Sequence, residues 1–174
     1  YAEFTSPTDP MGSPKPNPVS HVAYGYAAQV VILDENKRVT RVVAAHDVGH
    51  VVNPKSCEGQ VEGGFVQGMG WLTTEELVYD QQGRLRTHAP STYKIPCASD
   101  VPADFRVRLF ESRGNKEDTI YRSKAVGEPP LMLGISVWTA VFDAIASLRP
   151  GEIPKLDAPA TPEAILRAVK GLRA

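Results

Sequence analysis

Residues 53–72 constrain the fold of this 174-residue chain more than any other stretch. Asn53 followed by Pro54 is typical of a helix start, because asparagine caps free N–H groups and proline suits the first helical position. Apolar residues then recur at helical spacing, which predicts a face packed against a core. They are Val61, Phe65, Met69 and Leu72. The same helix contains five glycines: Gly59, Gly63, Gly64, Gly68 and Gly70. Each costs about 1 kcal/mol relative to alanine, so we expect another backbone or a ligand to approach this helix closely.

Irregular segments and segments typical of strands flank this helix. Residues 1–20 are predicted to be an irregular lead-in, because Pro, Ser, Thr and Gly crowd residues 4–18 and no apolar period survives there. Residues 24–33 and 38–48 are rich in Val, Ile and Ala around a polar break at residues 34–37, which predicts a β-hairpin. Further strand segments are expected at 77–79 and 85–87, as a second hairpin, and at 105–109, as a half-buried strand.

Two more helices are predicted in the C-terminal third of the chain. After Pro129 and Pro130, a long helix is apolar on more than one side, so we expect it to lie deep in the fold. Its apolar residues are Ile135, Val137, Trp138, Val141, Phe142 and Ile145. The last helix opens at Thr161 with an N-cap, a proline and an acidic first turn. Strand pairs and helices in mixed order favour an α+β fold, which we expect to be a single domain over residues 1–174.

The composition argues against several classes of function. A net charge of −1 with 22% charged residues gives no reason to expect nucleic acid or a membrane surface as partner. The two cysteines, Cys57 and Cys97, are too few for a disulfide framework and fit a reducing cytoplasm. The longest apolar stretch, residues 131–148, contains Asp143, which favours a buried helix over a membrane span. The chain starts without Met or a signal peptide, so we expect part of a larger cytoplasmic protein.

Two motifs have the spacing of known sites in the wrong context. His46 and His50 are spaced like the ligands of a zinc-binding HExxH helix, but they end a β-rich run, where their side chains would not converge. We therefore expect solvent-facing imidazoles and no metal ligand in the chain. Gly63 and Gly68 have the spacing of a phosphate-binding loop, but Met69 stands where the lysine is required.

The Gly-Glu-Pro-Pro sequence at residues 127–130 is a stronger candidate for chemistry. Glu128, directly before two prolines and a buried helix, is held on a stiff backbone near a helix N-terminus. Such a carboxylate either serves the helix dipole alone or acts as a general base, and the residues by themselves leave both interpretations open. Lys124, four residues earlier, would pair with Glu128 or be exposed. Glu75 and Glu76 are expected at a solvated helix end.

Several long segments follow one another in a fixed order along the chain. They are Asp47-Val48-Gly49, Asn53-Pro54, the glycine-rich residues 59–77, HAPSTYKIP at 88–96, SKAVGEPPL at 123–131 and LDAPATP at 156–162. In this order they resemble the xanthine dehydrogenase and aldehyde oxidase family of molybdenum hydroxylases. The similarity is to the C-terminal part of the molybdenum-cofactor-binding subunit, and it is closest to bacterial xanthine dehydrogenases.

The resemblance implies an α+β C-terminal molybdenum-cofactor-binding domain with mixed strands, the glycine-rich helix and a buried helix in its C-terminal half. It implies that Glu128 is the catalytic base, which deprotonates the oxygen that attacks an electrophilic C–H carbon. Gln60 matches the glutamine that hydrogen-bonds beside the molybdenum, and Gly127 would let the backbone approach the cofactor closely. The cofactor implied is molybdenum held by a pyranopterin (molybdopterin), and the protein supplies a positioned base.

The resemblance also implies partners and a substrate. The remainder of the molybdenum subunit, together with 2Fe–2S, FAD and NAD from other domains or subunits, would complete a larger oligomeric enzyme. A purine such as xanthine or hypoxanthine is the favoured substrate, and an aldehyde or another N-heterocycle is the alternative. A non-catalytic interaction domain is a further alternative, against which the intact Gln60 and Glu128 argue. We expect the chain alone to be inactive and to retain no molybdenum cofactor.

Overall fold

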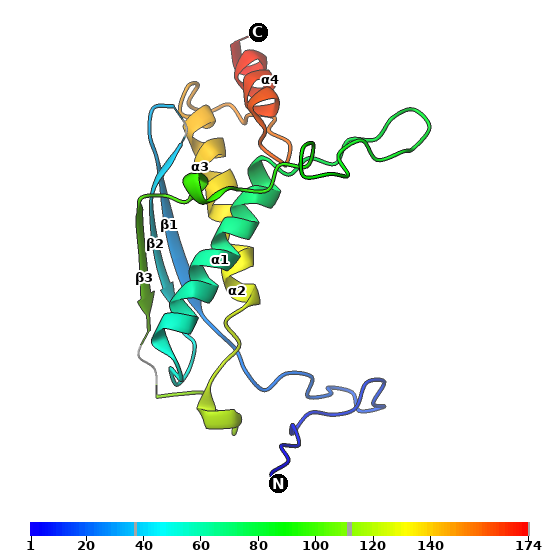
Figure 1. The fold of residues 1–174 in the computed structure, drawn as a ribbon, viewed down its shortest axis with the longest axis vertical. Coiled ribbons are helices and arrows are strands. Elements are labelled where there is room, and N and C mark those ends of the chain that lie inside the picture. The colour runs from blue at the N-terminus through cyan, green and yellow to red at the C-terminus, as the bar shows by residue number, and fades with distance from the viewer. Residues whose placement is uncertain (37, 111–112, 174) are drawn as a thin grey trace.

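A mixed three-stranded sheet organises the computed structural model, which describes residues 1–36, 38–110 and 113–173 (Figure 1). Strands β1 (Ala27–Leu33) and β2 (Val39–His46) form an antiparallel hairpin, and β3 (Asp104–Leu109) pairs in parallel with the other edge of β2. The predicted hairpin and the predicted third strand are thus confirmed, while Lys37 of the predicted break lies outside the described residues. Because parallel strands need a crossover connection, the chain leaves β2 through helix α1 (Pro54–Thr73) before it returns as β3.

Helices cover one face of the sheet, as Figure 1 shows. Successive residues of a strand point to opposite faces. In β2, Val42 and Ala44 are fully buried, whereas Val43 between them is 41% exposed. The apolar face that the sequence builds into β2 is therefore the one that receives the helices.

Helix α1 begins and packs as its sequence predicts. The Asn53 side chain accepts a hydrogen bond from the backbone N–H of Ser56 at 3.1 Å, which satisfies one of the free donors of the first turn. Val61 and Phe65 are fully buried. The ring of Phe65 meets that of Phe105 edge to face at 5.1 Å between centroids, which joins α1 to β3.

The single long helix predicted after Pro129 is interrupted. The structure has α2 (Glu128–Leu133) and α3 (Ile135–Ala146), with Gly134 between them. Gly134 is where this segment meets α1: a Cβ on Gly134 would lie 2.6 Å from the Cα of Gly68. By length and composition, Glu128–Ala146 is apolar enough to cross a membrane, with a mean hydropathy of 1.4. Its buried face nevertheless contributes Val137, Val141 and Ile145 to the core of this domain.

The core consists of two clusters that share α3. The first joins the sheet to α1 and α3 through Val42, Phe65, Met69 and Val137. The second joins α3 to residues 156–160 and to helix α4 (Pro162–Arg173) through Val141, Ile145, Leu156, Ala160, Ala168 and Leu172. The predicted last helix is confirmed, with the Thr161 hydroxyl accepting from the N–H of Ala164. The α+β fold class is confirmed.

The predicted irregular lead-in is confirmed, whereas the predicted second hairpin is shorter than expected. Residues 1–26 contain no helix or strand, as expected for a lead-in. The second hairpin is reduced to one bridge between Tyr79 and Leu85, in an arm that leaves the C-terminal end of α1 and projects away from the sheet (Figure 1). Longer pairing there would need a packed face, and Leu77 and Tyr79 are 58% and 57% exposed.

Candidate functional site

Glu128 is the first residue of α2, and its side chain is exposed. The backbone around it is held rigidly. Two prolines follow it, and Pro130 is buried against α1, where a Cβ on Gly64 would lie only 2.9 Å from its own Cβ. The structure therefore supplies the stiff backbone that the sequence predicts, but within the described residues it leaves the carboxylate open to solvent.

Helix α1 brings Gln60 next to Gly127. The Oε1 atom of Gln60 lies 3.9 Å from the position that a Cβ on Gly127 would occupy. Both residues are exposed, as is Glu128, which directly follows Gly127. The three residues predicted for one site therefore lie at the same end of the α1–α2 pair, although 67 residues of sequence separate Gln60 from Gly127. Their roles in catalysis and cofactor binding stay predictions.

Four of the five glycines of α1 fall into two groups, and the fifth, Gly70, lies against the side chains of Glu75 and Pro96. Gly64 and Gly68 face α2: a Cβ on Gly68 would lie 2.3 Å from the carbonyl oxygen of Leu131. Gly59 and Gly63 have no described atom within 4 Å of the position of an added Cβ. Approach of another backbone, one of the two causes expected from the sequence, thus explains the first group. The second group borders Gln60 and leaves the helix surface beside it free of side-chain bulk.

Lys124 neither pairs with Glu128 nor is exposed, which were the two arrangements considered from the sequence. Its ammonium donates to Asp47 Oδ2 at 2.6 Å and to the carbonyl oxygen of Tyr24 at 2.9 Å, and the Lys124 and Asp47 side chains are only 9% and 10% exposed. Sequence reasoning missed this ion pair, because 77 residues separate its partners. One feature of the sequence could have indicated the ion pair: Asp47 and Lys124 both lie in segments that resemble the family.

His46 is buried, which corrects the expectation of two solvent-facing imidazoles. Its side chain points with Val42 and Ala44 toward the helices and is 2% exposed, whereas His50 is exposed. Burial lowers the pKa of His46, because the interior disfavours the imidazolium form. The two side chains do not converge, and the described residues contain no group of three or more His, Cys, Asp or Glu side chains placed to hold a metal ion.

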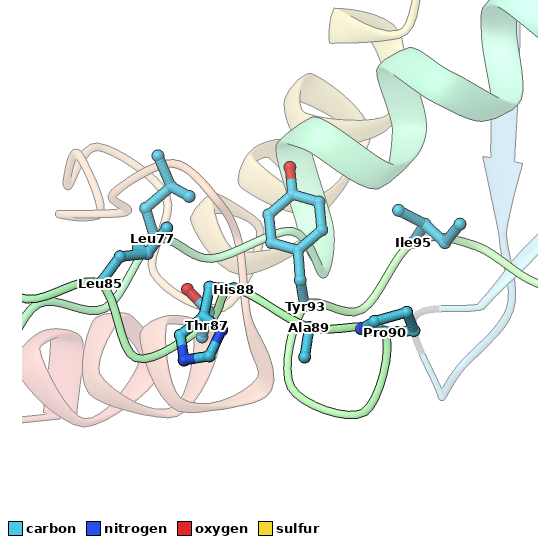
Figure 2. A pocket seen from close by; sticks show the side chains of 8 residues that line it. All are labelled: Leu77, Leu85, Thr87, His88, Ala89, Pro90, Tyr93 and Ile95. Atoms are coloured by element: carbon cyan, nitrogen blue, oxygen red, sulfur yellow. The ribbon is translucent and has the colours of Figure 1, made fainter.

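Glu75 is also buried rather than solvated. It is 9% exposed and accepts a hydrogen bond from the Tyr93 hydroxyl, and this bond raises the pKa of Tyr93. Figure 2 shows the Tyr93 hydroxyl pointing toward the C-terminal end of α1. The ring lines an apolar pocket of about 390 Å³ in the arm, together with Leu77, Leu85 and Ile95. The pocket contains none of the predicted site residues. Those residues lie exposed near the other end of α1, so the predicted site is an open surface.

Comparison with known families places the chain among cofactor-binding domains. The model of the molybdopterin cofactor-binding domain matches residues 2–102. The chain is 45% identical over 163 residues to xanthine dehydrogenase/oxidase of Felis catus, covering 87% of this chain and 12% of that protein. It is 41% identical over 162 residues to aldehyde oxidase 1 of Cavia porcellus, again spanning 12% of the relative.

Solved structures give the same result. Quinoline 2-oxidoreductase from Pseudomonas putida 86 superposes with a TM-score of 0.72 at 35% identity, over 85% of this chain and 19% of that chain. The Cu,Mo-CO dehydrogenase in its carbon monoxide-reduced state superposes with a TM-score of 0.75 at 25% identity, over 91% of this chain and 19% of that chain. The chain thus belongs to the molybdopterin cofactor-binding domain family of the molybdenum hydroxylases.

Proposed function

We propose that this chain contributes the catalytic base to a molybdenum hydroxylase that oxidises a C–H carbon of a purine. The observation that carries the proposal is the convergence of Gln60, Gly127 and Glu128 at one end of the α1–α2 pair. Glu128 could instead interact with the helix dipole alone. That role does not explain why the exposed amide of Gln60 and the glycine at position 127 lie beside it.

The residues at this end of α1 fit the molybdenum–pyranopterin group. A bulky, oxygen-rich ligand needs open space next to hydrogen-bond donors. Gly59 and Gly63 leave that space free, because nothing described lies within 4 Å of an added Cβ at either position. Gln60 supplies a neutral amide donor, which adds no charge beside a metal. Gly127 removes side-chain bulk where the backbone would face the group.

When bound, the cofactor would supply the redox chemistry that amino-acid side chains lack. The Glu128 carboxylate would accept the proton from the oxygen nucleophile as that oxygen attacks the substrate carbon. The prolines that follow and the packing of Pro130 on α1 fix the backbone that carries this carboxylate, which reduces the entropy lost on reaching the transition state. Gln60 would orient the bound group through its amide.

The rest of the enzyme would close the site. The chain spans only 12% of the length of its relatives, and all three site residues are exposed in it. We infer that the remainder of the molybdenum subunit covers them and excludes water, and that 2Fe–2S, FAD and NAD carry the electrons away. Four xanthine dehydrogenase/oxidase relatives at 44–45% identity favour the purine substrate over the two aldehyde oxidases at 39–41%. The xanthine dehydrogenases of Calliphora vicina and Drosophila subobscura are only 37% and 38% identical, so the two groups overlap and an aldehyde is an equal candidate.

The test compares the intact enzyme with its Glu128→Gln variant in xanthine-dependent urate formation. Loss of the base should raise the barrier by about 3–5 kcal/mol, or two or more decades in rate. Glu163→Gln is a matched control, because Glu163 also lies in the first turn of a helix and its side chain is 80% exposed. Equal rates for Glu128→Gln and wild type would exclude Glu128 as base. Oxidation of aldehydes without urate formation, by molybdenum-loaded wild type, would reassign the substrate.

A further inference from the structure

We propose that Lys124 is a positioning residue for Glu128 and acts through its buried ion pair with Asp47. The inference rests on the proposed function, since it concerns the placement of the proposed base. The Lys124 ammonium contacts Asp47, directly after β2, and Tyr24, before β1, and within the described part of the chain it forms no hydrogen bond with the site residues.

The side chains of the ion pair are 9% and 10% exposed, and each forms a further contact. Lys124 Nζ donates to Asp47 Oδ2 and to the carbonyl oxygen of Tyr24, and it lies 5.9 Å from the centre of the Tyr26 ring. The second carboxylate oxygen of Asp47 accepts the backbone N–H of Gly49 at 3.0 Å. Burial of two charges costs several kcal/mol per ion before their mutual attraction is counted, so such a pair marks a place where geometry is under strong constraint.

The backbone repeats the same connection. The N–H of Lys124 donates to the carbonyl oxygen of Val48 at 2.9 Å, and the N–H of His50 donates to that of Arg122 at 3.0 Å. Gly49 makes this approach possible: its φ is +68°, and an added Cβ would lie 2.6 Å from the Arg122 carbonyl oxygen. The ion pair and these two hydrogen bonds join the end of β2 to residues 122–124, and we call this connection the β2 clasp.

The chain enters the β2 clasp in a strained conformation. Tyr121 and Arg122 have φ values of +52° and +53°, which non-glycine residues adopt at a cost of about 1–3 kcal/mol each. Such strain persists only where the surrounding contacts over-determine the backbone. Here the Arg122 carbonyl oxygen accepts the N–H groups of both His50 and Asn115.

The β2 clasp lies close enough to Glu128 to set its position. Three residues lie between Lys124 and Glu128, and a fully extended chain over these four steps spans at most about 14 Å. On the other side of Glu128, Pro130 is buried against Gly64 of α1. The proposed base thus lies on a short segment between two anchors, the β2 clasp and the α1–α2 contact. Release of either one would let the carboxylate move.

The experiment uses the intact enzyme with three test variants and one control variant. Lys124→Met removes the cation, and Lys124→Arg restores one. The double variant Asp47→Asn/Lys124→Met leaves no unpaired buried charge, and its Asn oxygen can still accept from Gly49. Lys116→Met is the control, because Lys116 is exposed in the same segment. The measurements are kcat, KM, molybdenum content and hydrogen exchange of the backbone amides of residues 50 and 124, which donate the two hydrogen bonds of the β2 clasp.

For the double variant, we expect kcat to fall about 10–100-fold, since an ångström of misplacement of a catalytic group costs about this much. KM and molybdenum content should stay within about twofold of wild type, because only a transition-state interaction is lost. Exchange of the amides of residues 50 and 124 should become faster by about tenfold or more, because their hydrogen bonds open more often. Lys124→Arg should recover most of kcat, and Lys116→Met should match wild type.

The inference would be overturned by wild-type kcat in the double variant when Glu128→Gln is inactive, or by unchanged exchange of the amides of residues 50 and 124. A purely structural pair would lower thermal stability and molybdenum content without a selective fall in kcat, and that pattern also counts against it. If Glu128→Gln keeps the wild-type rate, the proposed function fails instead. The exchange measurement then decides by itself whether Lys124 holds the segment.

Discussion

The substitution Gly68→Ala tests whether α1 and α2 depend on direct backbone contact. A Cβ on Gly68 would lie 2.3 Å from the carbonyl oxygen of Leu131 and 3.1 Å from the Cα of Gly134. Both atoms belong to backbone, so no flexible side chain can move aside, and the two helices must separate by about 1 Å to reach ordinary contact distance.

The magnitude follows from two opposing effects. Overpacking of this kind costs about 3 kcal/mol, and replacement of a helical glycine by alanine returns about 1 kcal/mol through helix propensity. We therefore expect Gly68→Ala to lower the free energy of unfolding by about 2 kcal/mol. Gly59→Ala, in the same helix with no described atom within 4 Å of its Cβ, should raise it by up to about 1 kcal/mol.

The assay is urea denaturation of the purified chain, with both alanine variants and wild type under one set of conditions. The expected separation between the two variants is about 3 kcal/mol, which is well outside the error of such measurements. Equal stability of Gly68→Ala and Gly59→Ala would refute the argument, since it would mean that α2 moves away from α1 without cost. The separation of the helices would also be expected to displace the start of α2, where Glu128 lies.

Three further predictions concern the elements that support the site. Asn53→Ala should lower the free energy of unfolding by about 1 kcal/mol in the same assay, because the N–H of Ser56 loses its acceptor; no loss would show that the cap is dispensable. Phe65→Ala should lower it by about 3–5 kcal/mol, because a fully buried ring leaves a cavity between α1 and the sheet, and a loss below about 1 kcal/mol would contradict that packing. Burial lowers the pKa of His46, so below pH ~6.5 the unfolded state takes up a proton that the folded state resists, and stability falls as the pH falls. His46→Met should remove that part of the pH dependence between pH 7.5 and 5.5, up to about 1.4 kcal/mol per pH unit, and identical profiles for variant and wild type would exclude it.

The sequence by itself determined the local structure of this chain. The Asn53–Pro54 start, the apolar period of α1 and the paired Val-rich runs of the first hairpin are each encoded within a segment of about twenty residues. Capping, helical periodicity and strand alternation depend on such neighbours, which is why these predictions were confirmed. The second hairpin forms at the predicted place but is shorter than predicted, because its strands lack a surface to pack on.

The tertiary structure decided everything that depends on residues far apart. Only the fold shows that Gly68 faces Gly134, which interrupts the predicted long helix, and that Asp47 neutralises Lys124 across 77 residues. The tertiary structure also decided that His46 is buried. Strand alternation shows which residues share a face of the sheet, but not which face receives the helices. The residue types of the site are readable from the sequence, whereas their convergence depends on close packing of two backbones, a property of the assembled helices.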